Sequence, residues 1–279
     1  MIDFEIGEGL SNEDDLNAML MLTADDPLTY KEVVKSKKWR DAMAAEIESI
    51  EKNKTWELTS LPEGVKPIGV KWVFKTKLNE NGEVNKYKAR LVAKGYAQQY
   101  GVNYTEVFAI VARLDTIRLI LALAAHNNWD IFQLDVKSAF LHGELSEEIY
   151  VQQPLGFEKK GEEDKVYKLR KALYGLKQAP RAWYNKIEVY FVQAGFERCL
   201  CEHTLFTKWK EGKILIVSLY VDDLIYTGND KSMCDDFKNS MMLEFDMSDL
   251  GKMRYFLGVE VIQIQMDYLC VRESMHVKF

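Results

Sequence analysis

The chain has 279 residues, of which 47% are hydrophobic and 29% are charged, and its formal net charge is −6. This length suits one large domain or two closely packed subdomains, and the composition predicts a globular fold. No apolar run is long enough to cross a bilayer, and the first residues lack the basic and then apolar order of a signal peptide. We therefore expect a soluble intracellular protein without membrane contacts.

The negative charge is concentrated at the start of the chain. Residues 1–30 contain eight acids and no Lys or Arg, which leaves the remainder at +2. We expect residues 1–29 to form an acidic, flexible lead. Residues 66–94 contain eight basic residues and two acids, which predicts a local anion-binding surface. A solvated hairpin face is the plainer alternative.

The predicted elements follow no regular βαβ alternation. Residues 30–53 carry an apolar stripe at helical spacing. Residues 70–78 and 84–94 alternate like strands and are joined by an Asn-Gly turn, which predicts a hairpin. Residues 113–128 then predict a helix, 128–136 a strand, 142–164 a loop, and 179–195 a helix that ends at Gly195. Two buried strands over 213–228, a helix over 230–245 and short strands to the end complete a mixed α+β fold.

Several common site types find no support. The glycine patterns of Rossmann and P-loop domains and the GxSxG of serine hydrolases do not occur. The four cysteines form no disulfide framework. Cys199, Cys201 and His203 are spaced like neighbours on one face of a strand and offer three soft ligands without a clear fourth, so strand packing is favoured over a zinc site.

Asp222 and Asp223 lie side by side in LYVDDLIYTG, an otherwise apolar stretch. Neighbouring carboxylates repel each other and resist desolvation unless a cation neutralises them. Because strand side chains alternate between faces, the two can point together only if the backbone turns there, which predicts a tight hairpin. Asp135 also closes an apolar strand, and we expect that strand to neighbour the hairpin in the sheet. Carboxylate ligands of this kind suit magnesium.

The stretches QLDVKSAFLHGELSEEIYVQQPLGF, YKLRKALYGLKQAPRAWY and LYVDDLIYTG occur in this order. They resemble the reverse transcriptase domain of copia-type LTR retrotransposon Pol polyproteins, over about Pro27 to Gln265. The resemblance implies a right-hand polymerase fold with fingers and palm in residues 30–265, a divergent end over 266–279, and the thumb and ribonuclease H missing. The implied activity is RNA- or DNA-templated transfer of a nucleotide from dNTP to a primer 3′-hydroxyl.

The same resemblance implies roles for individual residues. Asp135, Asp222 and Asp223 would be catalytic and would hold two Mg²⁺ ions, or Mn²⁺ as a substitute, together with the backbone carbonyl of Val136. Phe140 would stack under the incoming sugar and exclude a ribose 2′-hydroxyl, unless it is an ordinary core phenylalanine. The implied nucleotide-binding residues are Lys75, Lys88, Arg90, Lys94, Gly175 and Gln178. The implied primer contacts are Phe256, Leu257 and Gly258.

The implied partners are a primed RNA or DNA template, dNTPs, and the ribonuclease H, integrase and protease segments of a full polyprotein. Virus-like particles in the cytoplasm are the implied location. Ile110 departs from the family pattern, which usually has proline there. Two alternatives remain: a catalytically inactive or degraded fragment that only folds or binds nucleic acid, and an unrelated metal-dependent phosphotransferase. The second would explain the acids but not LYGLKQAP or YFLG.

Overall fold

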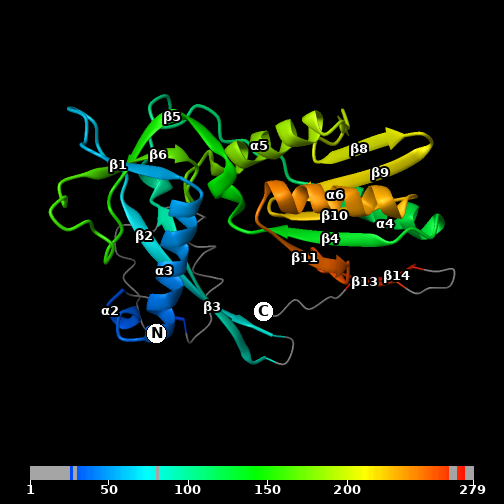
Figure 1. Ribbon diagram of the computed structural model, residues 1–279, viewed down its shortest axis with the longest axis horizontal. Coiled ribbons are helices and arrows are strands. Elements are labelled where there is room, and N and C mark those ends of the chain that lie inside the picture. The colour runs from blue at the N-terminus through cyan, green and yellow to red at the C-terminus, as the bar shows by residue number, and fades with distance from the viewer. Residues whose placement is uncertain (1–25, 28–29, 80–81, 264–268, 274–279) are drawn as a thin grey trace, which may run out of the picture. The chain divides into compact units, whose positions relative to one another are not determined.

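The computed structural model describes residues 26–27, 30–79, 82–263 and 269–273 (Figure 1). The chain divides into two compact units: unit 1 comprises Met1–Thr105 and Leu145–Ala179, and unit 2 comprises Glu106–Glu144 and Pro180–Phe279. Helices and antiparallel sheets are interspersed, which confirms the predicted α+β class. Most of the predicted acidic lead and of the divergent end lies outside the described residues. No helix in the described ranges is long and apolar enough to span a membrane.

Unit 1 combines two small sheets with one long helix. A two-stranded hairpin pairs β2 with β3, and a three-stranded sheet has the order β1-β6-β5. The elements are α2 (Tyr30–Val33), α3 (Lys37–Lys52), β1 (Trp56–Thr59), β2 (Val70–Leu78), β3 (Val84–Ala93), the 3₁₀ turn η1 (Gly95–Ala97), β5 (Glu144–Val151) and β6 (Val166–Lys171). Trp39 and Met43 of α3 pack against Phe74 and Ala89, so the helix covers one face of the hairpin.

Unit 2 is built on a six-stranded antiparallel sheet with the order β11-β4-β10-β9-β8-β7. Its strands are β4 (Ile131–Val136), β7 (Glu197–Arg198), β8 (Leu205–Lys210), β9 (Lys213–Tyr220), β10 (Asp223–Gly228) and β11 (Met247–Lys252). A further small sheet joins β12 (Tyr255–Phe256), β13 (Val259–Gln263) and β14 (Leu269–Glu273). The helices are α4 (Leu114–His126), the 3₁₀ turn η2 (Ala139–His142), α5 (Ala179–Gln193) and α6 (Lys231–Glu244).

The sheet of unit 2 is buried on both faces. On one face, α5 and α6 cover Leu134, Leu224 and the other core side chains that point to the same side of the sheet. On the opposite face, α4 and the β12–β13 hairpin cover Ile131, Ile225 and their same-face neighbours. Because side chains alternate along a strand, Asp135 and Asp223 lie on the face that carries Ile131 and Ile225.

The structure corrects three predictions. The helix expected over 30–53 is interrupted at residues 34–36. The stretch expected to be a loop, 142–164, contains strand β5, whose last three residues are buried and which joins β6 in the sheet. A distant pairing partner therefore overrides a local composition rich in Gly, Pro and acids. Cys199, Cys201 and His203 lie between β7 and β8 rather than on a strand, and Cys201 is exposed.

Candidate active site

Asp135 and Asp223 come together from two neighbouring strands of unit 2. Asp135 is the penultimate residue of β4 and Asp223 is the first residue of β10. The strands pair antiparallel with Asp223 directly opposite Asp135, a position in which Cβ atoms lie roughly 4.5–5.5 Å apart. The amide of Val136 donates to the carbonyl oxygen of Asp222 at 2.8 Å. The predicted adjacency of the Asp135 strand and the aspartate hairpin is thus confirmed.

The turn that carries Asp222 has an unusual backbone. Tyr220 pairs with Asp223 across β9 and β10, so Val221 and Asp222 are the two turn residues. Val221 has a φ of 54°, and Asp222 is not among the residues with positive φ. Positive φ at the first central residue alone is the pattern of a type II′ turn, which normally has glycine there. A β-branched residue in this conformation costs about 1–3 kcal/mol.

An indole from α5 holds this turn. Nε1 of Trp183 donates to the carbonyl oxygen of Val221 at 2.6 Å. Trp183 is 1% exposed, and its ring meets the ring of Phe245 edge-on at 5.4 Å between centroids. The sequence did not predict this contact, because its partners are 38 residues apart and no local pattern marks the bond.

The three carboxylates repel one another, and the pKa of Asp223 shows the effect. Burial raises the pKa of Asp223 to about 6, a hydrogen bond from Gln133 opposes the rise, and the charges of Asp222 and Asp135 add to it. The Gln133 amide donates to Oδ1 of Asp223 at 3.2 Å. Sequence reasoning missed Gln133, although its place two residues before Asp135 puts it on the same strand face. A cation beside these acids would relieve the repulsion.

The oxygen donors at this site are the three carboxylates and nearby backbone carbonyls, a ligand type that suits Mg²⁺. Among the described residues, no group of three or more His, Cys, Asp and Glu side chains is arranged to hold a metal by itself. Mg²⁺ commonly takes one or two carboxylates and completes its shell with water and substrate phosphates. The N–H and C=O of one strand residue point the same way, so the Val136 carbonyl is directed, like its amide, toward the Asp222 turn.

The predicted primer-contact residues form a second tight turn beside the aspartate hairpin. Phe256 pairs with Val259, and the intervening Leu257 and Gly258 both have positive φ, 50° and 80°. The ring of Phe256 is buried and meets the ring of Tyr220 edge-on at 6.2 Å. The two turns are therefore joined through their aromatic side chains.

Phe140 follows the aspartate strand closely. It is the second residue of η2, which is preceded by Ser138 in the left-handed conformation with a φ of 53°. Its ring is partly buried and packs against the core that α5 and α6 share with the sheet. The placement accommodates both predicted roles, sugar contact and core packing.

The predicted basic residues of unit 1 gather on one face of the β2–β3 hairpin. Lys75 lies directly opposite Lys88, and Lys77 lies opposite Lys86. Like charges in such positions repel each other. Arg90 lies on the same face by strand alternation, which is the face opposite Phe74 and α3. Lys94 follows the strand, and its amide donates to the carbonyl of Gly69 at 2.8 Å. The register thus places Lys75, Lys88 and Arg90 on one face of the hairpin, and their joint role in binding an anion stays a prediction.

Arg90 is held more firmly than a solvated arginine. Its guanidinium lies 3.9 Å from the centroid of the Tyr174 ring, and Nη1 is buried without a hydrogen-bond partner in the described part of the chain. Burial raises the pKa of Glu46, while the charge of Arg90, the amide of Leu91 and the charge of Lys88 lower it. Any phosphate contact therefore falls to the other N–H groups of Arg90.

Gly175 and Gln178 occupy a close-packed turn of unit 1. Gly175 has a φ of 86°, and a Cβ there would approach the carbonyl oxygen of Ala93 to 2.2 Å. Gln178 is 3% exposed. Its oxygen accepts from Gln98 at 2.9 Å, and its nitrogen donates to the carbonyl of Asn103 at 2.7 Å. The close backbone contact that calls for glycine at position 175 is therefore with Ala93 of strand β3. The side-chain amide of Gln178 already makes hydrogen bonds to other residues of unit 1.

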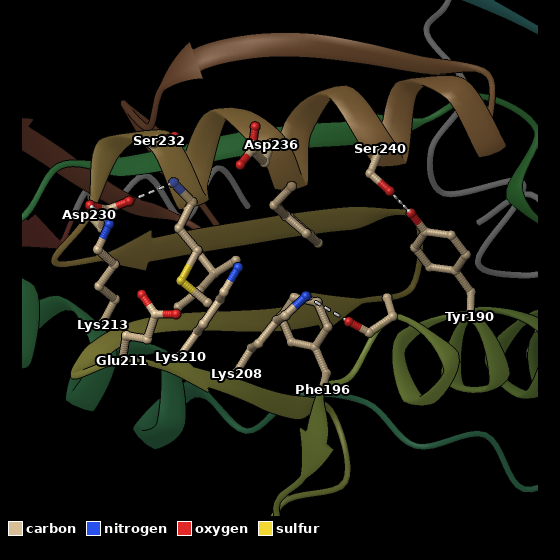
Figure 2. A pocket seen from close by; sticks show the side chains of 14 residues that line it. Tyr190, Phe196, Lys208, Lys210, Glu211, Lys213, Asp230, Ser232, Asp236 and Ser240 are labelled. Carbon is tan, nitrogen blue, oxygen red and sulfur yellow. Dashed lines mark hydrogen bonds and ion pairs between the residues drawn. The ribbon is translucent and has the colours of Figure 1, made fainter.

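A cavity of about 400 Å³ lies on the other side of the unit 2 sheet, between α6 and the β8–β9 hairpin (Figure 2). Two lysines of its lining have partners: Lys213 pairs with Asp230 at 2.8 Å, and Lys208 donates to the carbonyl of Ala194 at 2.7 Å. Phe237 and its core neighbours form the floor. None of the three aspartates lines this cavity.

The sequence of this chain matches one family model and parts of much longer polyproteins. Residues 53–276 match the family described as "Reverse transcriptase (RNA-dependent DNA polymerase)". The Pol polyprotein from transposon RE1 of Arabidopsis thaliana is 40% identical over 248 residues, which cover 88% of this chain and 17% of the relative. That from transposon TNT 1-94 of Nicotiana tabacum is 41% identical over 249 residues, covering 87% of this chain and 19% of the relative.

More distant similarity extends to a yeast polyprotein and to solved structures. The transposon Ty1-MR1 Gag-Pol polyprotein of Saccharomyces cerevisiae is 27% identical over 252 residues, covering 88% of this chain and 14% of the relative. A structure of telomerase from Candida albicans with a fragment of telomeric RNA aligns with a TM-score of 0.41 and 9% identity, covering 85% of this chain and 51% of that chain. The chain thus spans less than a fifth of the length of these polyproteins.

Proposed function

This chain belongs to the reverse transcriptase (RNA-dependent DNA polymerase) family, as it occurs in Pol polyproteins of copia-type retrotransposons, and on that premise we propose that it is a templated DNA polymerase module. It would transfer a nucleotide from a dNTP to the 3′-hydroxyl of a primer on an RNA or DNA template. The observation that carries the proposal is the direct opposition of Asp223 and Asp135, with Asp222 in the adjoining turn. Unit 2 would then be the palm, and unit 1 would supply the fingers.

The carboxylates of unit 2 would hold the metal ions and orient the reacting groups. Asp135 and Asp222 would be the main ligands, aided by Asp223 and the carbonyl of Val136. Two bound Mg²⁺ ions, or Mn²⁺ in their place, would activate the primer hydroxyl and neutralise charge on the triphosphate and the departing pyrophosphate. Gln133 would help to hold the Asp223 carboxylate in place through its hydrogen bond at 3.2 Å. No aspartate needs to act as a general base.

The remaining candidate residues would bind and select the substrate. The basic face of the β2–β3 hairpin would attract phosphate groups, with Lys75 and the free edge of Arg90 as donors. Phe140 would exclude a ribose 2′-hydroxyl by its bulk. The turn at Phe256–Gly258 would contact the primer, and its ring contact with Tyr220 would transmit the position of the primer to the aspartate turn.

Primer extension tests the proposal. The purified chain is given a primed RNA template, dNTPs and Mg²⁺, beside Asp222→Asn and Asp135→Asn. The matched control is Asp236→Asn, which makes the same chemical change at an exposed site on α6. We expect extension by the parent and the control, and a reduction of at least 10²-fold in both site variants, the scale on which removal of one transition-state interaction acts.

Two results would count against the proposal. Equal extension by parent and Asp222→Asn would exclude the aspartate mechanism. No extension by a parent chain that is folded and binds nucleic acid would favour the alternative of an inactive fragment that only binds.

A further inference from the structure

We propose that Trp183 is a positioning residue for the aspartate turn: its indole N–H fixes the central peptide between Val221 and Asp222 and so sets the direction of the Asp222 carboxylate. The catalytic consequence rests on the proposed polymerase function. The structural part rests on unit 2 alone, to which all three residues belong.

A two-residue hairpin turn has two related forms. Types I′ and II′ share a positive φ at the first central residue and differ by a flip of the central peptide, which changes the sign of φ at the second. In this turn the second residue is Asp222, a proposed metal ligand. A flip would therefore swing its Cα–Cβ bond and change the position of the carboxylate relative to Asp135. Whichever group holds the central carbonyl selects the form.

The indole of Trp183 is that group. It donates to the carbonyl of Val221 at 2.6 Å. Without this donor a partly buried acceptor would lose its hydrogen bond, at a cost comparable to the strain of Val221 itself. Packing does not replace the bond, because an apolar cavity of about 40 Å³ lies against Val221, lined also by Ile110 and Leu219. The turn thus has room to move on that side.

The indole is itself a rigid reference point. Its ring meets Phe245 edge-on and lies 5.9 Å from the ring of His142. The start of α5 is pressed onto Gly143, where a Cβ would come within 2.5 Å of the Trp183 amide nitrogen. Gly143 directly follows η2, so the segment after the Asp135 strand and the helix that steers Asp222 are fixed to each other. Trp183 thereby contacts both the turn that carries Asp222 and the segment that follows the Asp135 strand.

Three substitutions separate positioning from stability. Trp183→Phe keeps an aromatic ring and removes the N–H donor. Tyr184→Phe is the matched control, because the Tyr184 hydroxyl also donates from α5 to a backbone carbonyl, that of His203, at 2.7 Å, but makes no bond to the turn. Val221→Gly installs the residue that a type II′ turn prefers, so the turn should need the indole less.

The rate of primer extension at saturating dNTP and primer-template gives the first readout. We expect Trp183→Phe to lower this rate about tenfold, the effect of losing one partly buried hydrogen bond. Tyr184→Phe should keep a rate within about twofold of the parent when it is compared with Trp183→Phe at equal thermal stability. In the Val221→Gly background, Trp183→Phe should cost less than about threefold, a non-additivity that marks coupling. Equal losses in Trp183→Phe and Tyr184→Phe, or the same loss with Gly at position 221, would overturn the proposal.

A second readout needs neither metal nor activity. The nuclear Overhauser effect between the amide protons of Val221 and Asp222 is weak in a type II′ turn and strong once the central peptide flips. We expect it to strengthen in Trp183→Phe and to stay weak in Tyr184→Phe and in the double variant with Val221→Gly. An unchanged effect in Trp183→Phe refutes the positioning role. If the parent extends no primer while this effect behaves as expected, the polymerase proposal fails and the positioning role of Trp183 stands.

Discussion

Asp223 lies directly opposite Asp135 across β10 and β4, and in this setting its pKa rises to about 6, because it is partly buried and faces two further carboxylates. The same arrangement that would suit a divalent cation therefore weakens the fold when no cation is bound. Bringing these carboxylates together lowers the stability of the metal-free fold, a cost that is common at functional sites.

Asp223→Asn should stabilise the metal-free protein at pH 8. An acid whose pKa is raised by folding costs stability when it is ionised, so the cost is full above about pH 6 and disappears as pH falls toward the ordinary value of 3.8. Since the carboxylate is only partly buried, we expect about 1 kcal/mol, or ~2 °C in the unfolding midpoint. Thermal unfolding with chelator at pH 8 and pH 4.5 measures it. The exposed Asp236→Asn should show no gain, and a gain for Asp223→Asn that grows at low pH would contradict the explanation.

Phe140→Ala should relax sugar selection if the proposed function holds. Removing the ring opens space for a 2′-hydroxyl, so the ratio of ribonucleotide to deoxynucleotide incorporation should rise at least tenfold. The ring is partly buried in the core of unit 2, so the variant should also unfold at a lower temperature. Phe140→Leu serves as a control that keeps most of the packing. An unchanged ratio in both variants would assign Phe140 to the core alone.

The sequence was sufficient to locate the carboxylates because each lies where a local pattern ends. Asp135 closes an apolar strand, and Asp222 and Asp223 interrupt another, so alternation and turn chemistry predicted both the hairpin and its neighbour. The groups that hold these acids were not predicted. Gln133 was on the predicted strand but looked like any half-buried polar residue, and Trp183 looked like a core aromatic on a helix.

Strands whose partners are distant in the chain were also missed. β1 pairs with β6, where Trp56 lies opposite Leu169, and β5 joins the same sheet. Each carries charged residues, so local propensity is weak and pairing decides the conformation. The hairpin β2–β3 was predicted because its partners are adjacent and its turn contains Asn-Gly.

Lys75→Ala should weaken nucleic-acid binding and slightly stabilise unit 1. Lys75 faces Lys88 across the hairpin, so its removal relieves a repulsion worth about 0.2–1 kcal/mol. If the basic face binds phosphates, the slope of log affinity against log salt concentration should fall by about one for each phosphate that is no longer neutralised. Titrations of labelled primer-template at several salt concentrations measure the slope. Lys160→Ala, at an exposed lysine of unit 1, is the control, and equal slopes for both variants would place binding elsewhere.

Glu202→Gln should destabilise unit 2 at neutral pH and lose its effect in acid. Burial opposes ionisation of Glu202, but hydrogen bonds from the Thr204 and Thr116 hydroxyls, at 2.7 and 3.1 Å, and from backbone amides outweigh it and lower the pKa. The charged form therefore stabilises the fold above the ordinary value of 4.5, and this contribution is lost as pH falls through the lowered folded value. We expect a loss of about 1–2 kcal/mol at pH 7, measured by urea unfolding. The exposed Glu211→Gln should change little, and a deficit in Glu202→Gln that does not shrink as pH falls from 7 to 3 would show that packing rather than charge links the β7–β8 loop to α4.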